Sequence, residues 1–386
     1  MERFLFRKLE ADVWGEVATL PANSVKPIII VSSLEELGGT ERVAILLYLR
    51  LRVIFPQIRI IVLGGDAGPL TGCKGVVLIQ GGPSVRLFCR LAYFLKSTDL
   101  RDVILLGFSE LSNTFLGMLR LLRLIRAPLV LRCSTIISLS RPGRAAALRR
   151  LLTALTYRQA DRLVCQSEAM RSSILAEINI PKEKIQIIFN PFLGDVLNSD
   201  YQPNAIPGGG EPYILIIANF RPEKGHERFL KMYSLCGSRI KIVLLSPERS
   251  HQKIKRLLTE FGICQRAQLF SADVDVMSVL RGAVALVIPS YYEGYPNVAV
   301  EAAFAGVPII GFRDCAVLRE IIVPGETGEF IDESNPDSLS FAIKQCQNLP
   351  LWTPKRRQLL NRHKPEVFEK AYLDLLCMVK NEDNHH

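Results

Sequence analysis

The stretch from residue 289 to residue 311 reads PSYYEGYPNVAVEAAFAGVPIIG. It begins where a short apolar run ends, passes through a loop that holds Glu293, and then takes on the pattern of a helix. Pro296 suits the first helical turn, because the N–H that proline lacks would be unpaired there in any residue. Gly306 and Pro308 end the helix and lead into the next apolar run. This order of strand, loop, helix and strand predicts a β–α unit of a parallel sheet.

The same alternation continues in both directions from this stretch and covers almost the whole chain. The expected strands span residues 27–32, 58–63, 76–79, 103–106, 129–132, 163–166, 185–188, 213–218, 240–245, 267–270, 284–289, 307–311 and 328–331. The clearest expected helices span residues 40–54, with Thr40 as the cap, and residues 365–379.

The alternation stops at residues 198–212, where Asn, Asp, Pro and three consecutive glycines predict a flexible linker. A length of 386 residues also suits two domains. We therefore expect an α/β protein with two doubly wound, Rossmann-like domains, residues 26–197 and 213–364, whose parallel sheets face each other across a cleft. Residues 1–25 are an N-terminal extension, and the helix and tail at residues 365–386 are expected to pack back on the first domain.

The composition excludes several classes of protein. Hydrophobic residues make up 48% and charged residues 22%, which are globular proportions and exclude disorder and fibrous repeats. The nine cysteines are scattered without a C-x-x-C pair, which argues against a disulfide framework or a zinc site and favours reduced thiols in the cytoplasm. The N-terminus, MERFLFRKLEADVWGE, is charged throughout and is not expected to be a secretory signal. No stretch reaches the ~18 apolar residues of a spanning helix.

The positive charge is concentrated in the first half of the chain. The formal net charge is +10, and residues 1–200 hold 26 basic and 17 acidic side chains, whereas residues 201–386 hold 22 and 21. Nine arginines and no acidic residue lie between Leu111 and Ala160. The first domain is therefore expected to lie near negative charge.

One basic segment suggests a membrane surface as the source of that negative charge. Arg120, Arg123 and Arg126 are spaced by three within residues 115–131, which would place them along one helical face with leucine and isoleucine between them. That pattern is typical of a helix that lies on an anionic leaflet. The alternative is a buried α/β helix with a solvated basic edge. We favour the membrane interpretation, which predicts a cytoplasmic protein associated peripherally with the inner face of the membrane.

The start of the helix after Glu293 is the strongest candidate for a binding site. Loops at the carboxyl ends of parallel strands bind ligands, and the helix start at Pro296–Asn297 offers unpaired N–H groups to a phosphate. Glu293 and Glu301 flank this point, and carboxylates cannot themselves hold a phosphate. They make better sense as acceptors for hydroxyl groups on either side of it, as in a ribose and a sugar.

The spacing Glu293-x7-Glu301, inside EGYPNVAVEAAFAGVPII, resembles the signature of the family 4 retaining glycosyltransferases, which have the GT-B fold and include the group 1 enzymes of polysaccharide and lipid-linked glycan biosynthesis. Other segments support this resemblance, which covers roughly residues 26–375. ANFRPEKGHERFL (218–230) resembles the phosphate-binding loop of the family, LEELGGTERV (34–43) its glycine-rich first loop, and ADRLVCQSEAM (160–170) and IIFNPF (187–192) the segments that close the first domain.

The resemblance implies roles for the residues around this signature. Glu301 would bind the ribose hydroxyls of a nucleotide-sugar, and Glu293 a hydroxyl of the donor sugar. The residues that would line the sugar and the β-phosphate are Gly294, Tyr295, Pro296 and Asn297, with backbone amides from Tyr295 and Asn297. Retention in this family is thought to need no protein nucleophile, because the leaving phosphate takes the proton of the acceptor.

The diphosphate would be bound by residues of the other two loops. Lys224 would neutralise it, helped by Arg221, while Gly38 and Gly39 would let backbone amides approach from the first domain. Asn219, also expected at the donor site, stands where the family usually has an arginine, and we expect Arg221 to take over that role. Fixed cations and a helix N-terminus would stabilise the charge that develops on the leaving diphosphate, so Glu293, Lys224 and Arg221 are the expected catalytic residues.

Two further departures from the family pattern concern the substrates. Many members place a histidine in the first domain, but all five histidines here follow residue 212. Arg132 and Ser134 are possible substitutes on the acceptor side. The loop after the strand at residues 240–245 reads SPERS where a Gly-x-Gly turn is common, which puts the nucleotide contacts of that loop in doubt.

Three other features have a structural interpretation beside a functional one. Asp273-Val274-Asp275 is similar to the D-x-D metal site of another glycosyltransferase fold, but it precedes a helix and is expected to cap it. His226 could contact a phosphate, but a loop histidine beside a glycine is as often a solvated side chain, and the pair at residues 385–386 is too short for a metal site. We expect no metal and no cofactor, since the nucleotide-sugar is a substrate.

The leading hypothesis is a glycosyltransferase that uses a UDP- or GDP-sugar and a glycan or lipid-linked acceptor at an anionic membrane. One alternative is a catalytically degenerate relative that serves as a binding subunit of a glycan-assembly complex. Another is a sugar-nucleotide epimerase, which would need acid/base carboxylates and histidines that the first domain does not offer. No aromatic-interleaved basic patch favours nucleic acid as a partner.

Overall fold

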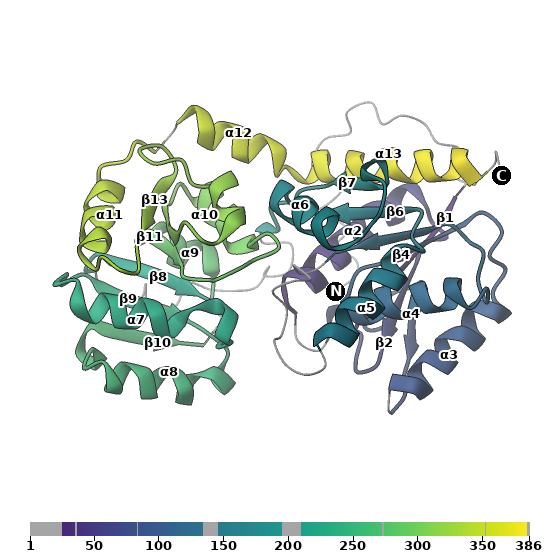
Figure 1. Cartoon of the computed structure of the whole chain (residues 1–386), viewed down its shortest axis with the longest axis horizontal. Helices are drawn as coiled ribbons and strands as arrows, with labels where there is room; N and C mark the ends of the chain where they lie inside the picture. Colours follow the sequence, from purple (N-terminus) through teal and green to yellow (C-terminus); the bar gives the residue numbers. More distant parts are fainter. Residues whose placement is uncertain are drawn as a thin grey trace. The chain divides into compact units, whose positions relative to one another are not determined.

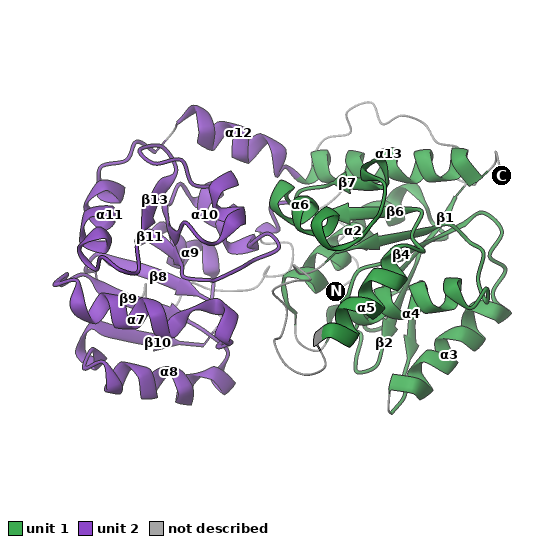
Figure 2. Cartoon of the chain, viewed as in Figure 1, with its two compact units in different colours: residues 1–190, 365–386 green, residues 191–364 purple. Residues whose placement is uncertain are grey.

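The computed structural model describes residues 25–34, 37–82, 84–133, 146–194, 210–271, 274–351 and 353–383. The chain divides into two compact units, one of residues 1–190 with 365–386 and one of residues 191–364 (Figure 2). Each unit contains one parallel sheet flanked by helices (Figure 1). Every expected strand is present, with its ends shifted by at most two residues. The α/β fold class with two Rossmann-like sheets is therefore confirmed.

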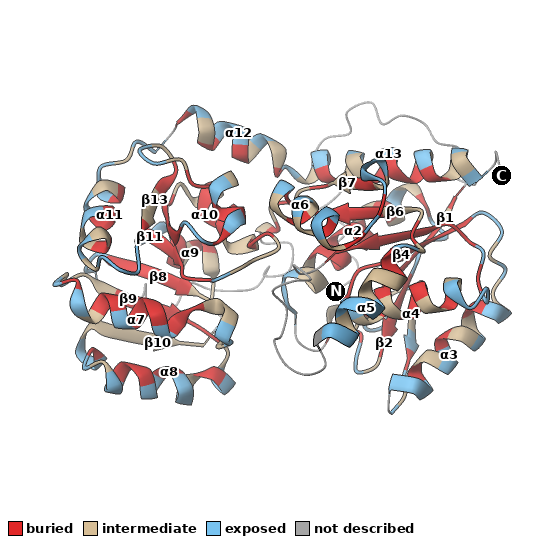
Figure 3. Ribbon diagram, viewed as in Figure 1, coloured by how far each residue is buried: buried red, intermediate tan, exposed pale blue. Residues whose placement is uncertain are grey.

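The first unit contains a seven-stranded parallel sheet with the order β3-β2-β1-β4-β5-β6-β7. Its strands are β1 (Lys26–Ser32), β2 (Arg59–Leu63), β3 (Val76–Ile79), β4 (Val103–Gly107), β5 (Leu129–Arg132), β6 (Arg162–Cys165) and β7 (Ile185–Ile187). Helices cover both faces of such a sheet, so its central strands read as continuous apolar runs and are buried (Figure 3). The strand order reverses between β1 and β4, and ligands bind at the carboxyl end of such a switch point.

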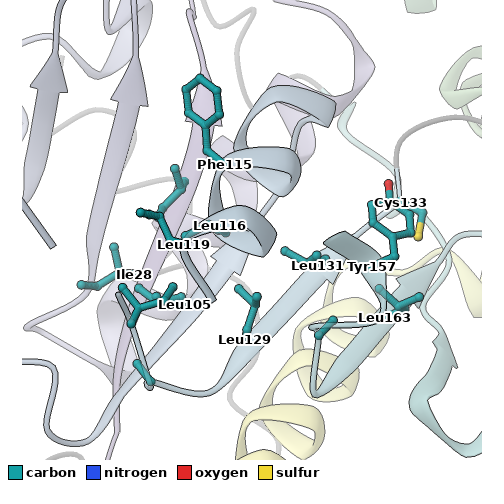
Figure 4. Packing of buried hydrophobic residues seen from close by; sticks show 14 of the residues in the cluster. Ile28, Leu105, Phe115, Leu116, Leu119, Leu129, Leu131, Cys133, Tyr157 and Leu163 are labelled. Carbon is teal, nitrogen blue, oxygen red and sulfur yellow. The ribbon is translucent and has the colours of Figure 1, made fainter. Parts of the chain in front are cut away.

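The helices of the first unit are α2 (Gly39–Ile54), α3 (Ser84–Ser97), α4 (Glu110–Leu121), α5 (Ala146–Tyr157), α6 (Glu168–Glu177) and α13 (Pro365–Asp383). Helix α2 begins one residue earlier than expected, so Gly38 and not Thr40 is its N-cap residue. On one face of the sheet, Leu116 and Leu119 of α4 pack with Leu105 of β4 and the neighbouring strands (Figure 4).

The C-terminal helix α13 belongs to the first unit and packs on α2 and β4. The ring of Tyr372 stacks on that of Phe108, with 6.0 Å between the ring centroids. Lys380 Nζ lies 2.7 Å from Asp102 Oδ1, and a second ion pair joins Arg162 to Glu382. The end of the chain is thus tied to the sheet that the beginning of the chain forms.

The expected membrane helix over residues 115–131 is wrong in its extent. Helix α4 ends at Leu121, because the chain must turn there to enter β5, and Arg123 takes a left-handed backbone conformation with φ 57°. Arg120 Nη1 donates to the carbonyls of Arg126 and Ala127, and its Nη2 lies 3.3 Å from Asp161 Oδ1. Arg120 therefore closes the end of α4 and does not share a helical face with the two later arginines.

The second unit contains a six-stranded parallel sheet with the order β10-β9-β8-β11-β12-β13. Its strands are β8 (Tyr213–Ile217), β9 (Lys241–Leu245), β10 (Ala267–Phe270), β11 (Ala283–Ile288), β12 (Ile309–Phe312) and β13 (Gly328–Ile331). Its helices are α7 (His226–Leu235), α8 (Glu248–Glu260), α9 (Val276–Arg281), α10 (Asn297–Ala305), α11 (Asp337–Gln347) and α12 (Pro354–Arg362). The order reverses between β8 and β11, so the two loops after these strands border the switch point.

The two ends of the second unit meet each other. The backbone N–H of Phe192 donates to the carbonyl oxygen of His363 over 2.7 Å. The Phe192 ring also stacks on Phe304 of α10, with 4.0 Å between the centroids and 4° between the planes. The segment by which the chain enters the second unit is thus bonded to the segment by which it leaves.

None of the nine cysteines, all of which lie in the described ranges, forms a disulfide. No helix among the described residues is long and apolar enough to cross a membrane.

Candidate active site

The loop after β8 and the loop after β11 are in direct contact. The β8 loop continues into a short 3-10 turn, Pro222–Lys224, and reaches α7 through Gly225, which has φ 65°. A Cβ atom at Gly225 would overlap the carbonyl oxygen of Pro289, so both the left-handed backbone and the close approach require glycine. The N–H of Tyr291 donates to the carbonyl of Glu223 over 2.9 Å. The two loops therefore form one continuous surface at the switch point.

Arg228 of α7, the helix that follows the β8 loop, binds the backbone of the β11 loop. Its side chain is 1% exposed, its Nε donates to Pro289 O over 2.7 Å, and its Nη2 donates to Ser290 O over 2.6 Å. Its Nη1 lies 2.7 Å from Asp314 Oδ2, and its Cζ lies 3.9 Å from the ring centre of Tyr291. Arg228 was not among the site residues predicted from the sequence. The available signal was an arginine on the buried face of a helix, next to Phe229 and Leu230.

Lys224 and Glu293, predicted to bind the diphosphate and the donor sugar, lie side by side. Lys224 Nζ is 2.6 Å from Glu293 Oε1, and the Ser290 hydroxyl donates to the same oxygen over 2.6 Å. Lys224 is 26% and Glu293 14% exposed, so each is partly shielded from water but reachable by a ligand. Such a pair holds both charges at fixed positions before any substrate arrives.

Helix α10 begins at Asn297, one residue later than expected, so Pro296 occupies the N-cap position. Glu301 lies one turn inside the helix and is buried, 5% exposed, among alanine and valine neighbours. A carboxylate is seldom buried in a short apolar helix unless it has a specific partner or task. Gly306 ends the helix with φ 79°, and Arg356 Nη1 of α12 donates to its carbonyl over 2.8 Å.

The side chain of Tyr295 is buried and bonded to the end of α12, and its backbone amide is the group that the sequence predicts for ligand contact. Its hydroxyl lies 2.8 Å from His363 Nε2 and accepts from Arg362 Nη2 over 2.7 Å. Burial raises the pKa of Tyr295 well above its usual value, and the nearby Arg362 opposes that rise only in part. Tyr295 thus anchors the β11 loop to the end of α12. Sequence reasoning missed Arg362 and His363, which have no motif.

Of the two interpretations of His226, the solvated side chain is wrong. His226 is the first residue of α7 and is 2% exposed, with its ring 5.4 Å from that of Phe220. Its Nδ1 is buried and has no hydrogen-bond partner among the described residues. Burial, and then the positive charge of Lys224, lowers the pKa of His226 to about 4. The imidazole is therefore neutral at neutral pH.

The other predicted residues of the β8 loop are more accessible. Arg221 starts the 3-10 turn and is 58% exposed, with Glu223 Oε1 3.9 Å from its Nη1 as its nearest carboxylate. Asn219, in the same loop, is half-buried. The long guanidinium side chain of Arg221 can therefore move within this loop, whereas Arg228 cannot.

The predicted residues of the first unit lie at the carboxyl edge of its sheet. Gly38 and Gly39 form the start of α2, which follows β1, and Arg132 is the last residue of β5. Arg132 is 3% exposed, so its side chain is buried. Ser134 lies outside the described residues, as do Asp273, the linker residues 198–209 and the residues before Val25.

Across the described ranges, no cluster of three or more His, Cys, Asp or Glu side chains could hold a metal ion. Asp275 accepts a hydrogen bond from Met277 N over 3.0 Å and caps α9, as its place before a helix predicts.

Two family models match the chain. The model described as Glycosyltransferase Family 4 matches residues 38–192, and the model described as Glycosyl transferases group 1 matches residues 200–364. The first match lies mainly in the first unit, and the second contains both loops of the candidate site.

Individual relatives match over part of their length. The uncharacterized glycosyltransferase MJ1607 of Methanocaldococcus jannaschii is 24% identical over 57% of this chain and 58% of its own length. The N-acetylgalactosamine-N,N'-diacetylbacillosaminyl-diphospho-undecaprenol 4-alpha-N-acetylgalactosaminyltransferase of Campylobacter jejuni is 19% identical over 51% of this chain and 53% of its own. The chain thus spans little more than half the length of these relatives.

A solved structure of similar fold is that of Anabaena Alr3699/HepE in complex with UDP and glucose, with a TM-score of 0.75. It is 13% identical, and the match covers 92% of this chain and 100% of that chain. This similarity concerns the fold of the two proteins.

Proposed function

This chain belongs to the family 4 glycosyltransferases of group 1, and from this premise we propose that it transfers a sugar from a UDP- or GDP-linked donor to a glycan or lipid-linked acceptor, with retention at the anomeric carbon. The observation that carries the proposal is the contact between the β8 and β11 loops, which places Lys224 2.6 Å from Glu293 beside the start of α10. Cations and a helix N-terminus in one surface suit a leaving diphosphate.

In this proposal each predicted donor residue has a chemical task. Lys224 and Arg221 neutralise the diphosphate, together with backbone amides of the loop that contains Gly294, Tyr295, Pro296 and Asn297. Glu293 accepts from a hydroxyl of the sugar, and Glu301 from the ribose. The positive charge that transfer requires then comes from the side chains and the helix start, and no metal ion is invoked.

A thermal-shift panel of UDP-glucose, UDP-N-acetylglucosamine, UDP-galactose and GDP-mannose tests the donor. A ligand that binds only the folded protein raises its melting temperature as its concentration exceeds the dissociation constant. We expect one nucleotide class to raise the melting temperature, and Glu301→Gln to abolish the rise. Glu227→Gln, an exposed glutamate of α7, is the matched control and should keep it.

The two possible negative results have different meanings. If no nucleotide-sugar shifts the melting temperature, the proposed donor site is wrong. If a donor binds but no transfer or hydrolysis follows with any glycan acceptor, the chain is a binding subunit instead of an enzyme.

We also propose that the first unit lies on an anionic membrane, through α5 and the end of α4 and not through a single arginine helix. Leu148, Leu151 and Leu152 recur at helical spacing on α5 and are 59%, 55% and 36% exposed. Helices α4 and α5 pack together, and Gly117 of α4 lies so close to Thr156 that a larger residue would clash.

Exposed leucines also end α4, at positions 121, 122 and 124, and Arg123 and Arg126 are exposed beside them. Apolar side chains flanked by arginines are the composition of an interfacial surface.

Flotation with vesicles of phosphatidylglycerol and phosphatidylcholine tests this surface. Replacing Leu148, Leu151 and Leu152 with serine should release the protein from the vesicles and leave nucleotide binding intact. Val85→Ser with Tyr93→Ser is the matched control, because these α3 side chains are 75% and 78% exposed in the same unit. Equal release by both sets would contradict a specific membrane face.

A further inference from the structure

Arg132 lies buried at the carboxyl edge of the first sheet with one side of its guanidinium unused. Its Nη2 donates to Asn190 Oδ1 over 2.6 Å, and its Cζ lies 5.5 Å from the ring centre of Phe108. Its Nη1 is buried and has no hydrogen-bond partner within the described part of the chain. A buried donor without a partner is costly, so its persistence calls for an explanation.

The charge of Arg132 is also uncompensated. Among the described residues, no carboxylate forms an ion pair with this guanidinium, and the charge of Glu41 acts on it without a hydrogen bond. Burial accordingly lowers the pKa of Arg132. Removing a partner from a buried ion pair typically costs several kcal/mol, so a lone buried guanidinium is a site that an anion would stabilise.

A second unused donor lies next to it. Tyr372 of α13 is fully buried, and its hydroxyl has no partner within hydrogen-bond distance among the residues the structure describes, although the Arg132 guanidinium is near enough to interact with it. Arg132 and Tyr372 are close enough that each affects the pKa of the other, and both contact the Phe108 ring. An anionic oxygen can accept from both donors at once.

The surrounding backbone holds this pair in place. Asn113 Nδ2 of α4 donates to the carbonyl of Arg132 over 2.8 Å, which fixes the end of β5. Gly107, at the end of β4, lies so close to Asn113 Oδ1 that a side chain there would clash. Arg132 thus has a built position at the edge of the sheet where doubly wound folds bind ligands.

We propose that Arg132 and Tyr372 bind an anionic oxygen of the acceptor substrate, a phosphate or a carboxylate, so that the enzyme selects negatively charged acceptors. That the bound molecule is an acceptor rests on the proposed function. That the site binds an anion rests only on the two unused donors. A free phosphate group and a sugar carboxylate share the same recognition chemistry here.

The test uses the full chain and three probes: inorganic phosphate, D-glucuronate, and D-glucose as the uncharged match to glucuronate. We measure the melting temperature against probe concentration for the wild type, Arg132→Met and Tyr372→Phe. Phosphate also suits the donor loops, but these are unchanged in both variants, so the difference from the wild type isolates the Arg132 site. Arg120→Lys, an arginine of the same unit that already pairs with Asp161, is the control.

We expect phosphate or glucuronate, but not glucose, to stabilise the wild type. Arg132→Met should weaken the apparent affinity for the anion at least tenfold, Tyr372→Phe severalfold, and Arg120→Lys not at all. Which of the two anions is preferred identifies the group on the acceptor. Equal anion responses in wild type, Arg132→Met and Tyr372→Phe would overturn the proposal. The unused donors would then bind an internal water molecule instead of an anion.

The two proposals fail separately. Tyr372→Phe removes one oxygen atom and provides the test even if Arg132→Met does not fold. A chain that binds anions through Arg132 but binds no nucleotide-sugar would keep this inference and reject the proposed function. A chain that binds a nucleotide-sugar but shows no anion effect at Arg132 would keep the proposed function and reject this inference.

Discussion

The ammonium group of Lys224 lies 2.6 Å from the carboxylate of Glu293, although the two residues are 69 positions apart in the chain. The contact joins the loop after β8 to the loop after β11, and each of these loops was predicted from its own sequence motif. In the proposed function, this contact places a cation for a diphosphate next to an acceptor for a sugar hydroxyl, as the two sides of a bond between a sugar and a phosphate require. The pair also means that each residue positions the other.

Replacing either partner should have a different effect on donor binding. Lys224→Met removes the charge that offsets the diphosphate, so donor affinity should fall and turnover should drop by about 100- to 1000-fold. Glu293→Gln removes the competing carboxylate, so donor affinity should be kept or rise while turnover falls. Titration calorimetry with the donor and a transfer assay measure both quantities. Equal weakening of binding by the two variants would show that the pair is only structural.

Arg228→Lys should weaken the contact between α7 and the β11 loop. Lysine keeps the charge but cannot donate to Pro289 O and Ser290 O together while facing Asp314. We expect a loss of about 2–4 kcal/mol in the free energy of unfolding, together with weaker donor binding. Arg221→Lys, 58% exposed, is the control and should change stability by less than about 0.5 kcal/mol. Urea unfolding compares the two, and equal effects would contradict the role of Arg228.

Gly225→Ala should disrupt the contact between the loops. The new methyl group meets the carbonyl of Pro289 and also faces a backbone with φ 65°. Gly237→Ala has nearly the same φ, 67°, with no atom within 4 Å of the added methyl group, so it isolates the backbone strain. We expect the Gly225 variant to lose clearly more thermal stability, and to lose donor binding, which the Gly237 variant keeps. Matching losses would mean that the close approach is unimportant.

His226 should make stability depend on pH. Its folded-state pKa of about 4 lies below the usual value of 6.5, so the unfolded chain binds the proton more tightly. The contribution to stability is therefore complete above pH 6.5 and is lost as the pH falls toward 4. Between pH 7 and pH 5 we expect a loss of about 2 kcal/mol. His226→Gln should abolish this part of the pH dependence in urea unfolding, and an unchanged slope would refute it.

The strands were predictable because a parallel sheet is buried on both faces. Each strand then reads as a short apolar run between turn residues, and all of the expected runs are strands in the structure. The loops after β8 and β11 were predictable for the same reason, since they follow the two strands on either side of the switch point. The identity of Lys224, Glu293 and Glu301 came from their motif, and their roles remain predictions.

The errors came from side chains whose partners are distant in sequence. The spacing of Arg120, Arg123 and Arg126 suggested one helical face, but Arg120 pairs with Asp161 and closes the end of α4. His226 resembled a solvated loop residue because only the folded structure covers it with Phe220. Periodicity reports which face of an element is apolar, and it cannot report a tertiary partner.

The residues that support the donor loop show the same limitation. Tyr295 lies inside the motif, but its side chain is bonded to Arg362 and His363, almost 70 residues later. No local pattern relates these residues. They meet only because α12 packs on α10, the helix that begins at Asn297.

The hydrogen bond between Phe192 and His363 has a consequence for how this protein can be divided. It joins the residues next to the first and the last of the second unit, and units whose ends meet tolerate excision and insertion. We therefore expect residues 191–364 to fold as a separate polypeptide, and to be transferable between related chains as a single genetic cassette that carries its nucleotide preference with it.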